Sequence, residues 1–273
     1  MALTRRRPAS LLLLLLLAAA LLAGSAAATG KTGNVVVFWG RNKDEGSLRE
    51  ACDTGTYTIA VISFLDVFGR GKYHLDLSGH DVSAVGADIK YCQSKKFLVF
   101  LSIGGFGGQY SLPTGQSAAD VADYLWNAYM LGTREGVHRP FGDAYVESWT
   151  ASTSSSTAAG GLGRTPTTSW PGGYGTTTSP TGLFNCIFVW FYDDPHCAAH
   201  LQQEWDRWTV PQPSTQIYLG LPASKRKVGY VHPKNLHAVI PVVQKAANYG
   251  DVVIWERYED KRTGYSTYAI QWA

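Results

Sequence analysis

Residues 97–105 read FLVFLSIGG, a short apolar run that ends in two glycines. A run that is apolar at consecutive positions and this short indicates a strand buried on both faces, the kind found in parallel sheets. Runs of the same kind recur at residues 34–39, 57–65, 187–192, 216–221 and 252–255.

Helical patterns fill the intervals between these runs, at residues 47–52, 81–92, 117–131, 198–208 and 233–248. The last of them begins with Pro233 at the first helical position, and Gly250 follows soon after its end. Alternation of strands and helices favours a parallel α/β fold. Six clear strands and a weaker seventh at residues 143–147 predict a (β/α)8 TIM barrel that is incomplete or disrupted around its fourth and fifth strands.

The composition changes abruptly over residues 148–182. Of these 35 residues, 27 are Gly, Pro, Ser or Thr, and Arg164 alone is charged. A flexible linker has this composition, but a barrel needs a strand and a helix at this place in the chain. The codon of Trp149 and those after it allow Asp-Gly-Val-Asp in a shifted frame. We therefore hypothesise that the segment from Ser148 onward is an out-of-frame reading of the fourth strand.

The amino-terminal residues have the pattern of a secretory signal peptide, because three arginines at 5–7 precede an apolar run and small residues. We expect a signal peptide at residues 1–28, one barrel domain at 29–273, and a secreted, extracellular protein. Removing these arginines from the 24 Lys and Arg residues leaves 21, which equals the 21 acidic residues. A neutral chain argues against nucleic-acid binding, which requires a basic face, and no second apolar stretch reaches membrane-spanning length.

Several short motifs occur in a fixed order along the chain. They read FWGRN at 38–42, SFLDVF at 63–68, YHLDLSGH at 73–80, SIGG at 102–105, FGDA at 141–144, FYDDP at 191–195, VHPKN at 231–235 and WERY at 255–258. Together they resemble the plant class III chitinases of glycoside hydrolase family 18, and most of all the xylanase inhibitor proteins of cereals that share their fold. The resemblance covers about residues 30–147 and 183–273, and it implies a (β/α)8 barrel.

The family's catalytic motif is missing from this sequence. The hydrolases carry D-G-x-D-x-D-x-E at the end of the fourth strand, and its glutamic acid protonates the leaving oxygen. Here Glu147 precedes the place where that motif would begin, and Arg41 stands where the hydrolases have glutamine. The resemblance therefore implies a protein without hydrolytic activity. Tyr192 and Trp255 match the tyrosine and the floor tryptophan of the family's sugar pocket, so they are either a vestigial sugar pocket or aromatic residues of the barrel core.

The resemblance also implies a binding site around Lys234, which lies between His232 and Asn235 in an H-P-K-N sequence. In the inhibitors this lysine enters the cleft of family 10 xylanases, where a cation meets paired catalytic carboxylates. An ordinary solvated lysine is the alternative. The loop that meets family 11 xylanases would lie within residues 148–182, so we expect family 10 enzymes as partners in preference to family 11.

The four cysteines fall into two groups. Adjacent barrel helices would bring Cys52 and Cys92 together, and the pair matches a disulfide of the family. A strand that starts at Cys186 carries the chain roughly 20 Å away, too far for the few remaining residues to return Cys197 to bonding distance. Cys197 matches a family half-cystine whose partner would lie in the disrupted segment, so we expect Cys186 and Cys197 to be free or mispaired.

These observations predict a secreted, monomeric plant defence protein that resembles inhibitors of fungal endo-1,4-β-xylanases and is not hydrolytic. One alternative is a chitin-binding lectin or residual class III chitinase that takes chitin oligosaccharides. Another is a product whose barrel does not fold. No cofactor or metal is expected, because His196 and His200 have helical spacing near Cys197 but no identified third ligand.

Overall fold

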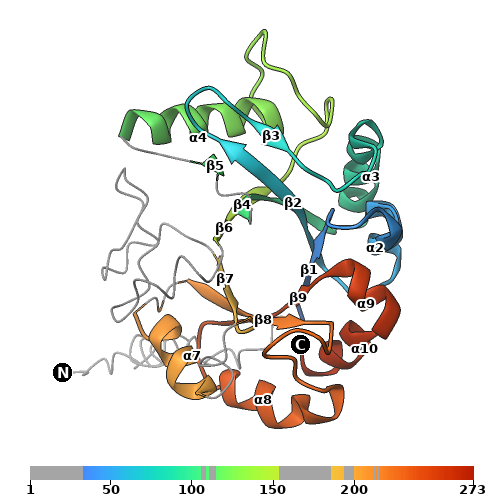
Figure 1. Ribbon diagram of the computed structural model, residues 1–273, viewed down its shortest axis with the longest axis vertical. Coiled ribbons are helices and arrows are strands. Elements are labelled where there is room, and N and C mark those ends of the chain that lie inside the picture. The colour runs from blue at the N-terminus through green and yellow to red at the C-terminus, as the bar shows by residue number, and fades with distance from the viewer. Residues whose placement is uncertain are drawn as a thin grey trace, which may run out of the picture.

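The computed structural model describes residues 33–105, 109–110, 115–153, 186–193, 200–211, 213 and 215–273. Seven parallel strands form the main sheet, in the order β6-β4-β2-β1-β9-β8-β7 (Figure 1). Their bounds are β1 Val35–Trp39, β2 Ile59–Phe68, β4 Leu98–Gly105, β6 Ser148–Thr153, β7 Cys186–Trp190, β8 Gln216–Pro222 and β9 Tyr249–Trp255. Two short strands, β3 (His74–Leu75) and β5 (Gln109–Tyr110), pair with β2.

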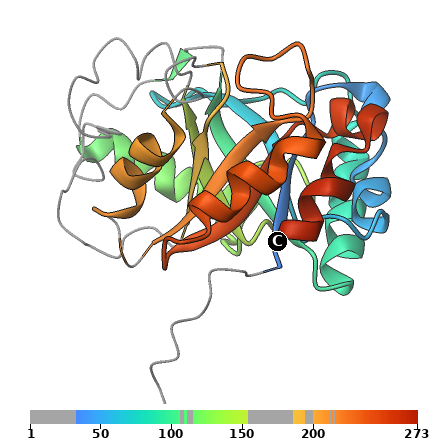
Figure 2. The same ribbon diagram turned by 90° about the horizontal axis from the view of Figure 1, so that it is seen from below.

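The sheet curls, and the helices surround it on the outside (Figures 1 and 2). Strands β6 and β7 are the two ends of the sheet order, and within the described ranges no pairing joins them. The fold is therefore an incomplete (β/α)8 barrel, as predicted. The helices are α2 Leu48–Asp53, α3 Val82–Ser94, α4 Gly115–Tyr129, α7 Leu201–Thr209, α8 Leu236–Val243, α9 Arg257–Thr263 and α10 Tyr265–Ala269, with short 3-10 helices at Lys43–Glu45, Pro233–Asn235 and Ile270–Trp272.

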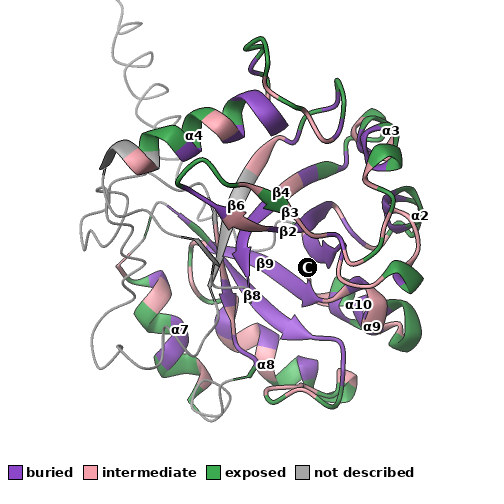
Figure 3. Cartoon of the chain, turned by 45° about the horizontal axis from the view of Figure 1, so that its top comes forward, coloured by how far each residue is buried: buried purple, intermediate pink, exposed green. Residues whose placement is uncertain are grey.

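Alternate residues of the strands build two separate apolar cores. In β1, Val35, Val37 and Trp39 pack with the surrounding helices, whereas Val36 and Phe38 belong to a second cluster formed by strand residues and Tyr192. All five residues of β1 are buried, and Figure 3 shows the burial of the central strands in purple. Burial on both faces explains why these strands read as continuous apolar runs rather than as alternating ones.

The structure corrects the sequence-based assignment at three places. The seventh strand does not lie at residues 143–147 but at Ser148–Thr153, where it pairs in parallel with β4. The segment expected to be irregular from residue 148 therefore begins as a strand. The helix expected at 233–248 is a 3-10 turn followed by the shorter helix α8. Helices α9 and α10 were not predicted, because Arg257–Thr263 is largely charged.

Several predicted features lie outside the described residues. They are the signal peptide at 1–28, Arg164, His196 and Cys197; of Cys186, only its place at the start of β7 is described. In the described part of the chain, none of the helices combines the length and the apolar character that a membrane crossing requires.

Candidate functional site

An aromatic cluster fills the carboxyl end of the barrel, where the active sites of such folds lie. Strands β7 and β9 bring Tyr192 and Trp255 together, with ring centroids 6.0 Å apart and planes inclined by 24°. Trp190 lies 5.5 Å from Tyr192, and Phe64 lies 6.0 Å from Trp255. Tyr192 is only 2% exposed and Trp255 only 6%. The two residues matched to a sugar pocket therefore pack mainly against other rings, and their role in sugar binding stays a prediction.

Arg41 lies at the end of β1, beside this cluster. Its guanidinium is 5.1 Å from the centre of the Phe64 ring and donates to Asp76 Oδ2 at 3.0 Å. Burial alone would raise the pKa of Asp76, but the Ser78 amide and the Arg41 guanidinium outweigh it and hold that pKa below its ordinary value. The residue that replaces the hydrolases' glutamine is thus held at the mouth of the barrel by a stacking contact and an ion pair.

No carboxylate occurs in strand β6, which has the sequence SWTAST. Glu147 precedes the strand and faces its amino-terminal end, where Oε2 accepts the Val99 amide at 2.8 Å and Oε1 accepts Gln93 Nε2 at 2.9 Å. Because catalytic groups of barrel enzymes lie at the carboxyl ends of the strands, Glu147 is placed at the opposite end from that chemistry. The family resemblance gives Glu147 no catalytic role, and this stays a prediction.

A pocket of about 450 Å³ opens beside Trp255, between the ends of β7, β8 and β9. Glu256 lines it, and burial, reinforced by the nearby charge of Glu45, raises the pKa of Glu256 to about 7. Two ion pairs cross the rim of the pocket, from Arg226 to Glu259 at 2.7 Å and from Lys227 to Asp193 at 2.8 Å. The pocket is lined mainly by charged residues, and burial raises the pKa of its Glu256 to about 7.

The predicted xylanase-binding residues form an exposed turn before α8. His232, Lys234 and Asn235 are all exposed. The His232 Nδ1 accepts the Lys234 amide at 3.2 Å, and the His237 Nδ1 lies 2.6 Å from the Lys234 carbonyl oxygen and donates to it. Among the described residues, no ion pair includes Lys234. The turn therefore fixes the backbone of Lys234 while its ammonium group faces solvent.

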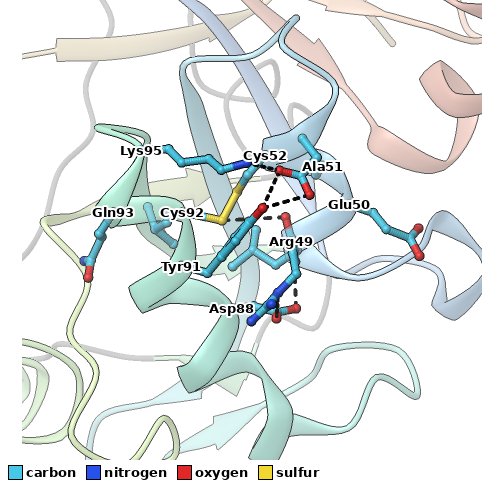
Figure 4. The surroundings of a disulfide bond; sticks show 12 residues. Arg49, Glu50, Ala51, Cys52, Asp88, Tyr91, Cys92, Gln93 and Lys95 are labelled. Carbon is cyan, nitrogen blue, oxygen red and sulfur yellow. Dashed lines mark hydrogen bonds and ion pairs between the residues drawn. A yellow bond between two sulfur atoms is a disulfide. The ribbon is translucent and has the colours of Figure 1, made fainter.

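The predicted disulfide between Cys52 and Cys92 is present, with a Cα–Cα distance of 5.7 Å, and it links α2 to α3 (Figure 4). Polar contacts join the same helices. The Tyr91 hydroxyl donates to Asp53 Oδ1 at 2.9 Å, and Arg49 Cζ lies 4.1 Å from the centre of the Tyr91 ring. This cluster lies among the outer helices and is structural.

Two features of the carboxyl-end surface were missed in the sequence. Glu256 directly follows the matched Trp255, so its position in the WERY motif could have indicated it. Between Asp206 and Asp251 the sequence contains no acidic residue but six lysines and arginines. That asymmetry is readable from the sequence and indicates a basic surface.

Comparisons with known proteins agree with this architecture. No protein-family model matches the chain. A crystal structure of a xylanase-α-amylase inhibitor protein in complex with trehalose superposes with a TM-score of 0.75 at 32% identity, covering 88% of this chain and 99% of the other. The xylanase inhibitor protein 1 of Triticum aestivum is 48% identical over 88% of both chains. An acidic endochitinase of Cicer arietinum is 35% identical over 85% of this chain and 89% of its own.

The fold and the aromatic mouth define a chitinase-like (β/α)8 barrel. Within that class, the sequence identity of 48% to the xylanase inhibitor of Triticum aestivum, over 88% of both chains, determines the family. The chain belongs to the family of xylanase inhibitor proteins.

Proposed function

We propose that this protein is a secreted, non-hydrolytic inhibitor of fungal endo-1,4-β-xylanases. The observation that carries the proposal is the turn at Pro233–Asn235, which presents Lys234 to solvent at the start of α8. The turn follows β8, so it lies at the carboxyl end of the barrel, where binding surfaces of this fold are built. The relatives named xylanase inhibitors support the same assignment.

The chemistry of the partner follows from the charge of Lys234. A glycosidase of the two-carboxylate type carries an acid and a base or nucleophile in one cleft. An ammonium group that enters such a cleft gains hydrogen bonds and Coulomb attraction in a desolvated place. Family 10 xylanases are the proposed targets, and His232 and Asn235 flank the inserted lysine. Contact with family 11 enzymes is not proposed, because the corresponding loop falls in residues 148–182.

Two observations support the absence of hydrolysis. Strand β6 has no acidic residue, and the side chain of Glu147 is bonded at the amino-terminal end of the barrel. Without a positioned general acid, the leaving oxygen cannot be protonated in the way the hydrolases do it. Secretion, and action as a monomer, belong to the same proposal and rest on the amino-terminal sequence and on the family resemblance.

The test of this function is titration of a fungal family 10 xylanase with the wild-type chain and with Lys234→Ala. We expect wild-type inhibition and a loss of at least about 30-fold in the variant, because a desolvated charge contact is worth about 2 kcal/mol or more. Lys245→Ala is the matched control, since this exposed lysine lies beyond the other end of α8. Equal inhibition by Lys234→Ala and wild type would refute the assigned docking residue.

A further inference from the structure

The charge asymmetry between Asp206 and Asp251 is concentrated in one loop. Of the six cations in that interval, four lie in residues 223–235, a stretch that contains no acidic residue. This stretch joins β8 to the helix α8, and Figure 2 shows it in orange, extending beyond the ends of the strands. The basic loop and the Lys234 turn are thus one continuous segment at the carboxyl end of the barrel.

Several contacts hold this loop in place. Two of its three consecutive cations are anchors, because Arg226 pairs with Glu259 and Lys227 pairs with Asp193. Gly229 has a φ of +81°, and a Cβ at that position would come within 2.4 Å of the Phe191 carbonyl oxygen, so the backbone closely approaches the residue that follows β7. The Tyr265 hydroxyl donates to the Val231 carbonyl oxygen at 2.9 Å.

Besides the exposed residues of the Lys234 turn, two side chains of the loop remain for a partner, Lys225 and Val228. Lys225 is exposed, and within the described residues it takes part in no ion pair. Val228 is 47% exposed, although its carbonyl oxygen accepts the Asp193 amide at 2.9 Å. A loop that is already ordered loses little conformational entropy on binding, so its exposed groups contribute more of their interaction energy to affinity.

We propose that residues 223–235 form a single docking surface, in which Lys225 meets the acidic rim of the target enzyme's cleft and Val228 packs against that rim. The proposal rests on the proposed function and names a second contact beside Lys234. Charge complementarity carries it, because the two cations of this stretch that make no ion pair among the described residues, Lys225 and Lys234, match a cleft that holds paired carboxylates.

The two lysines should differ in kinetics. A rim charge acts chiefly on the association rate and its salt dependence, whereas a desolvated charge acts on the dissociation rate. The experiment measures both rates for the complex with a fungal family 10 xylanase at low and high salt. We expect Lys225→Ala to slow association about three- to fivefold at low salt, and much less at high salt. Lys225→Arg should keep the wild-type rate.

Val228→Thr tests the apolar contact with a side chain of the same shape. We expect dissociation to become about two- to threefold faster, with an unchanged association rate. Lys245→Ala serves as the charge control and should match wild type in both rates. Wild-type rates for both Lys225→Ala and Val228→Thr, in a chain that still inhibits through Lys234, would overturn the extended surface alone. A wild-type chain that does not bind the xylanase would instead overturn the proposed function and this inference together.

Discussion

At the scale of single residues, Glu256 is the most perturbed acid at the carboxyl end of the barrel. Burial disfavours its charged form, and the charges of Glu45 and Glu259 add to that effect. Arg41 and Lys227 act in the opposite direction but do not compensate. The result is a carboxyl group whose pKa is about 7 in the folded protein, against an ordinary value near 4.5.

The raised pKa of Glu256 predicts how stability depends on pH. Because the folded state binds this proton more tightly than the unfolded state, the free energy of unfolding should fall as pH rises from about 4.5 to 7. The full loss, on the order of 1–3 kcal/mol, should apply above pH 7. Urea unfolding across this range would measure it.

The control is Glu256→Gln, which cannot ionise. We expect this variant to lack the decrease between pH 4.5 and 7 and to be more stable than wild type at pH 8. Identical pH profiles for the two chains would show that Glu256 titrates normally.

The stacked rings of Tyr192 and Trp255 give a test of the alternative that the protein is a chitin-binding lectin. Tyr192 and Trp255 have almost no exposed surface, and Arg41 lies over the neighbouring Phe64 ring. A sugar would therefore meet little of the faces of these two rings. We expect chitin oligosaccharides to leave the tryptophan emission of the wild-type chain unchanged, with a class III chitinase as the positive control. Saturable quenching would instead identify the protein as a chitin-binding lectin.

At the scale of elements, the sequence predicts strand positions best where a strand is buried on both faces, because such a strand is a continuous apolar run. Strands β1, β2, β4, β8 and β9 were placed this way within a few residues. Strand β6 was misplaced, because its sequence SWTAST has no apolar run, and only pairing with β4 reveals it. The family resemblance predicted the turn around Lys234. The ion pairs that anchor the loop could not be predicted, because they join residues that are distant in sequence.

The disulfide between α2 and α3 gives a prediction about stability. It closes a loop with a sequence separation of 40 residues. The chain-entropy relation gives about 4 kcal/mol for a loop of this length. Replacing Cys52 and Cys92 together by alanine should lower the free energy of unfolding by roughly that amount, measured in urea at constant pH.

Tyr91→Phe is the comparison for that pair of substitutions. It removes the hydroxyl contact to Asp53 on the same two helices and leaves the disulfide intact. Because that contact is exposed, its loss should cost about 1 kcal/mol or less. If both chains lost the same stability, the disulfide would contribute nothing beyond the helix contact.

At the scale of the whole molecule, the barrel is incomplete, but the loop of residues 223–235 and the elements on both sides of it are formed. Among the described residues no pairing joins β6 to β7, but β8, β9 and the helices α8 to α10 around the proposed docking loop are all present. The aromatic cluster joins residues of β1, β2, β8 and β9 into one inner core. The elements that present Lys234 therefore lie outside the segment 148–182 in the sequence.

The central claim is that the turn bearing Lys234 occupies the active-site cleft of a xylanase. The most direct measurement is steady-state kinetics of a fungal family 10 xylanase on a soluble xylo-oligosaccharide at increasing concentrations of this protein. Occupation of the cleft predicts competitive inhibition, in which the apparent KM rises with the protein concentration and kcat stays constant. A fall in kcat at constant KM, or no inhibition at all, would contradict the claim.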